Sequence, residues 1–305
     1  MRSVVEARAT NLKALPTSFI GRDSALRALA ESLARSRLVT VLGPPGTGKT
    51  RLAQEHALAL LRSPEAPSGG VFFCDLSEAT TVDGVVGRIA ALLGVELAGA
   101  IPPEEALLRL EAALRGRGPL LLVLDNFEQL VRPARALLAG LLAATAVHTR
   151  LLVTSRERLG VAGEALFDLG PLLLPDESGS APSEAVDLFL ERARAASHTF
   201  QPSPRELADI GKLVRLLDGL PLAIELAAAR TRMLSPGEII ERLRGHFTLL
   251  TRDPSTLRAG RATLWETIEA SWALLSPWER RALAQVSIFR GGFSADAAGR
   301  VAGPP

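Results

Sequence analysis

The chain has 305 residues, 47% of them hydrophobic and 22% charged, with a formal net charge of +2. These values are typical of a folded globular protein with room for more than one domain, and they exclude an intrinsically disordered chain. The sequence contains no dense basic block that would indicate a nucleic-acid-binding surface, and no apolar run approaches the ~20 residues that a membrane-spanning helix needs.

The N-terminus and the single cysteine indicate the cellular compartment in which the protein folds. Residues 1–10 carry charges and lack the apolar centre of a signal peptide. Cys74 lies in an apolar run, which predicts a buried thiol, and a lone cysteine cannot form an internal disulfide. We therefore expect a cytoplasmic protein.

Short apolar segments alternate with amphipathic segments up to residue 175. The apolar segments predict strands at 38–42, 71–76, 120–124, 151–154 and 166–169. Apolar spacing of three and four residues predicts helices at 24–36, 50–61, 82–93, 103–114 and 133–146. Buried strands that alternate with helices are typical of an α/β fold, with a parallel sheet between layers of helices.

The second half of the chain has a different pattern. Residues 175–182 are rich in Pro, Ser, Gly and Asp, and residues 251–261 form a second break. The helices expected around these breaks lie at 183–196, 204–217, 220–231, 235–243, 262–274 and 277–286. We divide the chain into a leader at 1–17, an α/β domain at 18–175, an all-helical domain at 176–250 and a partial unit at 251–305. Because the chain ends in Gly-Pro-Pro, which cannot close a domain, we expect it to be truncated there.

The tryptophans Trp265, Trp272 and Trp278 have helical spacing in the last part of the chain. We expect them to be core residues rather than part of a binding site.

A glycine-rich loop follows the first predicted strand. Residues 43–50, Gly-Pro-Pro-Gly-Thr-Gly-Lys-Thr, fit the pattern G-x-x-x-x-G-K-[ST]. Gly46 and Gly48 allow backbone N–H groups to approach phosphate oxygens, and the helix that follows directs its partly positive end to the same anion. Lys49 is expected to reach the β- and γ-phosphates and Thr50 to bind Mg²⁺. The sequence therefore predicts a nucleoside triphosphate site.

Polar residues follow two further strands. Asp125 ends the strand at 120–124, where a carboxylate would hold the Mg²⁺ of a P-loop protein. Glu128 could polarise the attacking water, although a solvated glutamate at a helix start is nearly as plausible. Residues 154–156 end the next strand and should face the same crevice. Arg156 could reach the γ-phosphate; the alternative is a surface pair with Glu157 or Glu164. Pro221 begins a predicted helix and by spacing alone has no function.

Taken together, these segments are similar to a known family. The chain resembles the bacterial STAND ATPases, relatives of the AP-ATPase/NB-ARC switch proteins. The matching segments are 15–22, 43–50, 122–130, 152–157, 219–227 and 289–293, in the family's order. The resemblance implies a P-loop NTPase fold, a helical domain and a partial winged-helix domain from about residue 251. The family's winged-helix histidine is not identifiable, because His246 lies too early.

The resemblance also implies roles for residues. Ile20 and Arg22 would lie against the adenine, Arg156 would sense the γ-phosphate, and Pro221 would couple the nucleotide to domain closure. The residues expected to contact the nucleotide are Ile20, Arg22, Gly43, Pro44, Gly46, Thr47, Gly48, Lys49, Thr50, Arg51 and Pro221. The residues expected to act in hydrolysis are Lys49, Asp125, Glu128 and Arg156, with Mg²⁺ bound by Thr50 and Asp125.

Three functional hypotheses follow. The first is an ATP/ADP switch with slow hydrolysis that self-associates with ATP bound and regulates signalling or transcription through effector and repeat sensor domains missing from this chain. The second is an AAA+-type motor with rapid turnover or a small-molecule kinase. The third is a winged-helix regulator that binds DNA, which the balanced charge disfavours. We expect no membrane partner.

Overall fold

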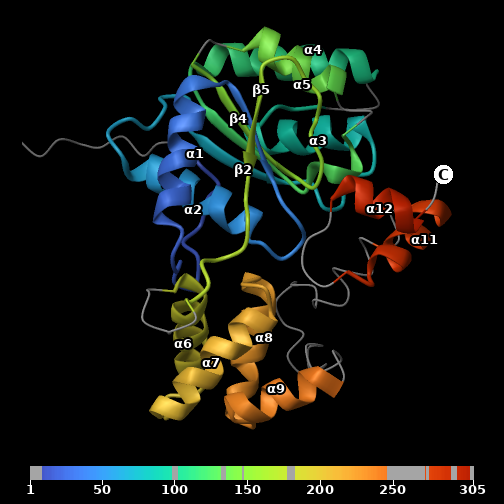
Figure 1. Ribbon diagram of the computed structural model, residues 1–305. Coiled ribbons are helices and arrows are strands. Elements are labelled where there is room, and N and C mark those ends of the chain that lie inside the picture. Colours follow the sequence, from blue (N-terminus) through green and yellow to red (C-terminus); the bar gives the residue numbers. More distant parts are fainter. Residues whose placement is uncertain are drawn as a thin grey trace, which may run out of the picture.

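Five parallel strands form the sheet at the centre of the first half of the computed structural model (Figure 1). The structure describes residues 9–97, 102–131, 135–145, 148–176, 183–245, 272, 275–289 and 294–302. The strands are β1 (Leu38–Leu42), β2 (Val71–Asp75), β3 (Leu121–Asp125), β4 (Arg150–Ser155) and β5 (Glu164–Asp168), in the order β2-β3-β4-β1-β5. All five predicted strands are present, and the predicted α/β class is confirmed.

Helices cover both faces of this sheet. They are α1 (Asp23–Arg35), α2 (Lys49–Arg62), α3 (Val82–Leu93), α4 (Pro103–Arg117) and α5 (Arg135–Ala144). Alternate residues of β3 face opposite sides: Leu121 and Val123 pack with α1 and α2, whereas Leu122 and Leu124 pack with α3, α4 and α5. Both faces of the strand are therefore apolar, as expected for a parallel sheet between two helical layers.

Residues assigned to the leader add to the edge of the sheet. The N–H of Val71 donates to the carbonyl of Ala9 at 3.1 Å, and the side chain of Asn11 forms two hydrogen bonds with the backbone of Phe73. Since β2 is an edge strand, these bonds satisfy backbone groups that would otherwise lack partners.

The second half of the chain has a hydrophobic core of its own. It is built from α6 (Glu184–Ala196), α7 (Pro204–Leu216), α8 (Pro221–Ala229) and α9 (Pro236–Gly245). Ser203 and Glu206 form a capping box at the start of α7, and Pro221 occupies the first turn of α8. The boundaries of the helical domain, 176–250, stay a prediction.

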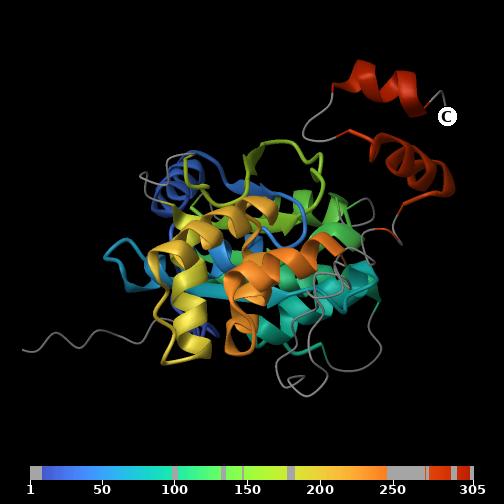
Figure 2. The ribbon, with the colours of Figure 1, turned by 60° about the horizontal axis from the view of Figure 1, so that its bottom comes forward.

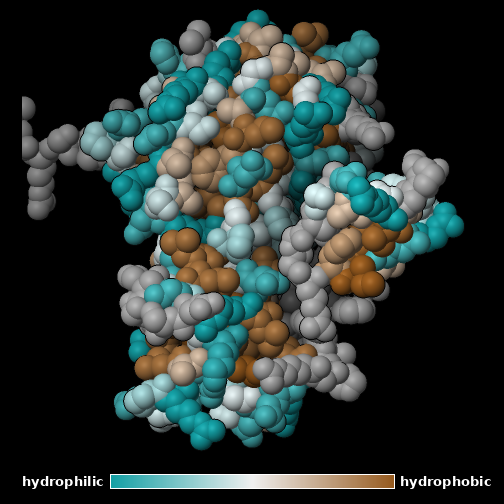
Figure 3. Space-filling view, in the orientation of Figure 1, coloured by the Kyte–Doolittle hydropathy of each residue, from teal (hydrophilic) through white to brown (hydrophobic). Residues whose placement is uncertain are grey.

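Two further helices, α11 (Pro277–Val286) and α12 (Ala295–Ala302), lie apart from the rest (Figure 2). The range of α11 was predicted, whereas α12 was not. Trp272 and Trp278 are 39% and 36% exposed, so the expectation of buried tryptophans is wrong for these two. The reason is that α11 buries only Val286, and Figure 3 shows hydrophobic side chains at the surface of this helix pair.

Most of the predicted winged-helix unit, including Trp265 and the helix at 262–274, lies outside the described residues. Among the helices that the structure does describe, none has the length and apolarity to span a bilayer.

A buried histidine on α2 generates a prediction about stability. His56 is 8% exposed, and burial lowers its pKa from 6.5 to about 4. The unfolded chain therefore binds a proton at higher pH than the folded chain, and stability is lost as pH falls from about 6.5 towards 4. His56→Leu removes this titrating group. Between pH 7.5 and 4.5 the variant should therefore lose about 2–3 kcal/mol less unfolding free energy than the unaltered chain. Urea unfolding of both proteins at pH 7.5 and 4.5 measures this difference. Equal losses of unfolding free energy in the two proteins would contradict the prediction.

Candidate functional site

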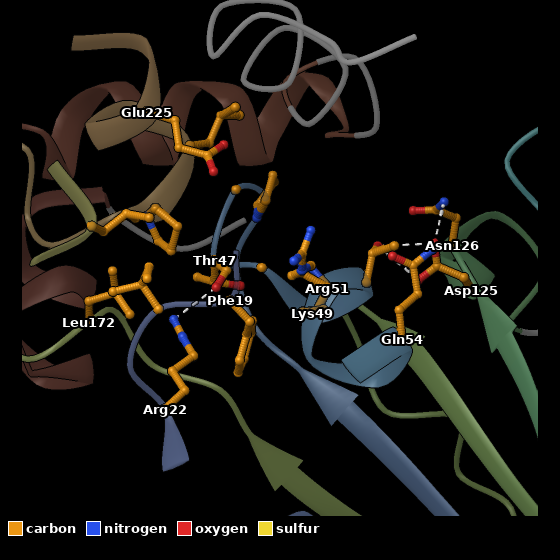
Figure 4. Close-up of a pocket in the computed structure, with 18 of the residues that line it drawn as sticks. Phe19, Arg22, Thr47, Lys49, Arg51, Gln54, Asp125, Asn126, Leu172 and Glu225 are labelled. Atoms are coloured by element: carbon orange, nitrogen blue, oxygen red, sulfur yellow. Dashed lines mark hydrogen bonds between the residues drawn. The ribbon is translucent and has the colours of Figure 1, made fainter. Parts of the chain in front are cut away.

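A cavity of about 540 Å³ lies at the carboxyl ends of β1, β3 and β4. Its walls come from the glycine loop and α2, from the ends of β2, β3 and β4, from residues 18–22, and from α6 and α8. Figure 4 shows Arg22 and Leu172 towards one end of this cavity, Asp125 and Asn126 towards the other, and Lys49 between them. The topology explains this meeting, because the carboxyl ends of parallel strands share one edge of the sheet.

The glycine loop leaves β1 and enters α2 in a strained backbone path. Gly46 and Gly48 have φ values of 80° and 90°, which side chains with a Cβ rarely adopt. The Lys49 amine donates to the carbonyls of Gly43 at 2.8 Å and Pro44 at 3.2 Å, and the Thr47 hydroxyl donates to Pro44 at 2.8 Å. The loop is therefore held by its own polar groups around the start of α2.

Lys49 is a partly buried cation. Burial lowers the pKa of its amine, and the charge of Glu128 opposes that shift. Because its partners are carbonyl oxygens rather than a carboxylate in direct contact, an anionic ligand would stabilise its charge.

Asp125 is the centre of a polar cluster at the opposite end. It is 2% exposed, and both of its oxygens accept a bond from the Thr50 hydroxyl, at 2.9 and 3.0 Å. The Thr154 hydroxyl donates to it at 2.5 Å, and the Asn126 amide at 3.0 Å. Burial raises the pKa of Asp125 to about 6, although the threonine hydrogen bonds lower it. A carboxylate held here against the cost of burial is typical of a cation site.

Glu128 and Arg156 form an ion pair at the same end. The Nε of Arg156 donates to Oε1 of Glu128 at 2.9 Å. Arg156 thus has a partly buried carboxylate partner that the surface alternative did not name. Glu128 follows β3 on the 3₁₀ turn Phe127–Gln129, and its other oxygen, Oε2, is buried without a hydrogen-bond partner.

The apolar end of the cavity contains Ile20, together with Leu172, Leu188 and Pro221. Arg22 also lines the cavity, but its guanidinium donates to the carbonyls of Thr47 at 2.8 Å and Gly170 at 2.9 Å. Its side chain therefore supports the glycine loop by joining Thr47 to the segment at Gly170. Burial lowers the pKa of Arg22, and the charge of Glu184 opposes this.

Arg51 also lines the cavity, and it joins the segment before residue 20 to α2. Its guanidinium donates to the hydroxyl of Thr17 at 2.9 Å and to the Thr17 carbonyl, pairs with Glu55 at 2.8 Å, and lies 5.9 Å from the ring centre of Phe19. These contacts attach the segment before residue 20 to α2.

The first turn of α8 contacts the glycine loop directly. The N–H of Leu222 donates to the carbonyl of Gly46 at 3.2 Å. A Cβ on Gly46 would lie 3.1 Å from that of Leu222, and one on Gly48 would lie 4.0 Å from the Cγ of Pro221. Pro221 is thus placed beside the loop, and the helical half of the chain is joined to it by a backbone hydrogen bond.

Sequence reasoning missed several residues of the site. Thr154 was expected to face the crevice from its strand end, but its hydrogen bond to Asp125 was not predicted. Glu184 accepts from the backbone N–H groups of Arg22 at 2.5 Å and Leu173 at 3.2 Å, which ties α6 to both segments. Arg192 pairs with Glu225 at 2.9 Å beside the apolar end. No sequence signal pointed to these last residues, because they come from different helices.

The groups present fit a nucleoside triphosphate with Mg²⁺. Gly46 and Gly48 leave the backbone uncovered by a Cβ, and the partly buried amine of Lys49 suits a phosphate. The Thr50 hydroxyl and the Asp125 carboxylate place hard oxygen ligands at one point, as Mg²⁺ prefers.

Comparisons with known proteins agree with this geometry. The family described as AAA domain matches residues 33–155. The uncharacterized protein Rv0894 of Mycobacterium tuberculosis is 36% identical over 282 residues, which are 92% of this chain and 68% of that protein. The provisionally named HTH-type transcriptional regulator Rv0890c of the same species is 37% identical over 88% of this chain and 29% of its own length. Among solved structures, Cdc6p of Pyrobaculum aerophilum has a TM-score of 0.53 at 19% identity, over 90% of this chain and 75% of its own, which shows the fold alone.

The contact between Gly46 and Leu222 generates a prediction. Gly163 has the same φ of 80° as Gly46, but a Cβ there would meet nothing within 4 Å. We expect Gly163→Ala to cost about 1–2 kcal/mol of unfolding free energy through backbone strain alone. Gly46→Ala should cost more, because its Cβ also displaces Leu222.

Chemical denaturation measures both costs, and hydrogen exchange at the Leu222 amide separates their causes. Exchange should become faster in Gly46→Ala and stay unchanged in Gly163→Ala. Equal costs with unchanged exchange would show that the loop and α8 are not coupled.

Proposed function

We propose that this chain, which belongs to the family of Rv0894 and carries the nucleotide-binding domain of a P-loop ATPase, is a switch operated by exchange of ADP and ATP. In this proposal ADP holds the helical half against the nucleotide-binding half. ATP favours a second arrangement that self-associates, and slow hydrolysis resets the switch. Such a bias can be only as large as the difference in affinity of the two arrangements for the two nucleotides.

The observation that carries the proposal is the contact of α8 with the glycine loop. The loop that would hold the phosphates also accepts the N–H of Leu222 through Gly46. A change in loop geometry on nucleotide binding would therefore alter the packing of the helix that carries Pro221. Nucleotide state and the placement of the helical half are linked through one backbone segment.

The residues at the polar end have roles in this proposal. Lys49 binds the β- and γ-phosphates, and Thr50 and Asp125 hold Mg²⁺, which neutralises phosphate charge when bound. Thr154 keeps Asp125 in position. Arg156 senses the γ-phosphate, and Glu128 orients the attacking water.

Slow hydrolysis is supported by the residue after Asp125. Asn126 carries an amide, which cannot accept a proton as a general base, and that amide donates to Asp125 and to Asp75. The remaining candidate base, Glu128, is engaged by Arg156. The chain is thus proposed to be a weak Mg²⁺-dependent ATPase.

An AAA+-type motor is the second candidate, favoured by the match of residues 33–155 to the AAA domain. A role in transcription is proposed from the name of Rv0890c, of which this chain spans 29%. The sensing and effector parts of such a regulator, and any DNA contact through residues 251–305, are proposals of the same kind.

The site assignment predicts the effect of removing Lys49. Lys49→Ala should weaken ADP and ATP binding at least about 100-fold, because a buried charge-assisted contact to phosphate is lost. Lys212→Ala is the matched control, since that lysine is exposed on α7 and pairs with Asp209 on the same helix. Titration calorimetry measures both affinities. Unchanged affinity in Lys49→Ala would contradict the site.

Turnover separates the switch from the motor. A switch should hydrolyse ATP well below once per second and retain ADP through purification, whereas a motor would reach about tens of events per second. Steady-state phosphate release, identification of the retained nucleotide, and light scattering with a non-hydrolysable ATP analogue test these expectations. Rapid turnover without nucleotide-dependent self-association would overturn the switch.

A further inference from the structure

The ion pair between Glu128 and Arg156 has a second consequence, which rests on the proposed nucleotide site. Both residues line the cavity, and they follow β3 and β4, the strands that end at Asp125 and Ser155. Figure 4 shows Asp125 on the far side of Lys49 from Leu172. In the proposed site, a nucleoside with its base at the apolar end would direct its last phosphate past Lys49 towards this pair. A triphosphate would then reach Glu128 and Arg156, whereas a diphosphate would end nearer to Lys49.

The position of Glu128 is fixed by its neighbours. Phe127 and Leu130, on either side of it, are fully buried in the core below the sheet edge. The side chain of Glu128 is 12% exposed and that of Arg156 is 25% exposed. The Glu128 carboxylate is therefore the more deeply buried member of the pair, and the Arg156 guanidinium is the more exposed one.

The chemistry of the pair makes it costly to open. Oε1 of Glu128 accepts from Arg156, and Oε2 is buried without a partner. If Arg156 moved to a phosphate, the carboxylate would keep its charge in a poorly hydrated place with its principal counter-ion gone. Both charges also act on Lys49, since Glu128 raises the pKa of that amine and Arg156 lowers it. The pair thus lies within electrostatic reach of the lysine that holds the phosphates.

We propose that Glu128 is a specificity-determining residue that competes with the terminal phosphate for Arg156 and so lowers the affinity of the site for a nucleoside triphosphate relative to the diphosphate. A triphosphate must open the ion pair in order to contact Arg156, and a diphosphate leaves the pair closed. The same opening frees the Glu128 carboxylate to accept a hydrogen bond from water only when a third phosphate is present. Glu128 would therefore favour the ADP-bound state at rest.

A double-mutant cycle tests this competition. ADP and a non-hydrolysable ATP analogue are titrated, with Mg²⁺, into the full chain and into Glu128→Gln, Arg156→Gln and the double variant. Glu128→Gln is nearly isosteric, so ADP affinity should change less than about twofold in every variant, which also reports correct folding. Glu157→Gln is the matched control, because Glu157 is an exposed neighbouring carboxylate.

The effect of Glu128→Gln on triphosphate affinity should depend on whether Arg156 is present. With Arg156 present, Glu128→Gln should tighten the triphosphate analogue about tenfold, the worth of a charge-assisted hydrogen bond. With Arg156→Gln, the same change should tighten it less than about threefold, because only the repulsion between carboxylate and phosphate remains. Arg156→Gln alone should weaken the triphosphate analogue and leave ADP unchanged.

Three outcomes would overturn the inference. Equal tightening by Glu128→Gln in both backgrounds would mean simple repulsion and no competition for Arg156. Weaker triphosphate binding in Glu128→Gln would assign Glu128 a supporting contact instead. If the unaltered chain bound neither nucleotide, the proposed function would be wrong together with this inference. If it bound ADP but Glu128→Gln had the same effect with and without Arg156, only the inference would be wrong.

Discussion

The glycine loop is held between the starts of two helices, and the rest of the site depends on this constraint. Gly48 is the N-cap of α2, and the first turn of α8 donates the Leu222 N–H to the carbonyl of Gly46. Both helices direct the positive ends of their dipoles at the same segment, which favours an anion between them. The loop therefore cannot change shape without affecting α8, which belongs to a different hydrophobic core.

The polar end of the cavity concentrates charge that is expensive to bury. Lys49 and Arg156 face Asp125 and Glu128 in a poorly hydrated space, and burial alone would disfavour the charge on Lys49 and Asp125. Hydroxyl groups from Thr50 and Thr154 offset part of this cost at Asp125. Sites that bind charged ligands commonly keep charged residues in partly buried positions, although this lowers the stability of the fold.

Much of the fold could be predicted along the chain. Strands buried on both faces are apolar throughout, so β1 to β4 were recognised within one residue at most ends, and the capped helices α7 and α11 within a residue of their bounds. Short elements with weak patterns were harder, and α12 was missed. Trp272 and Trp278 have the spacing of core residues but are exposed, because helical spacing does not tell whether another element covers the face.

The sequence by itself determined the local chemistry: the glycines that allow positive φ, the lysine and threonine that follow them, and the aspartate at the end of a buried strand. Each depends on neighbours within a few residues, so each leaves a readable pattern. Only the tertiary structure decided that Arg156 pairs with Glu128, that Arg22 supports the loop and that Glu184 joins α6 to the backbone of Arg22. Those contacts join residues 25 to 162 positions apart, and their partners are set by the order of strands and the packing of helices, which local pattern does not contain.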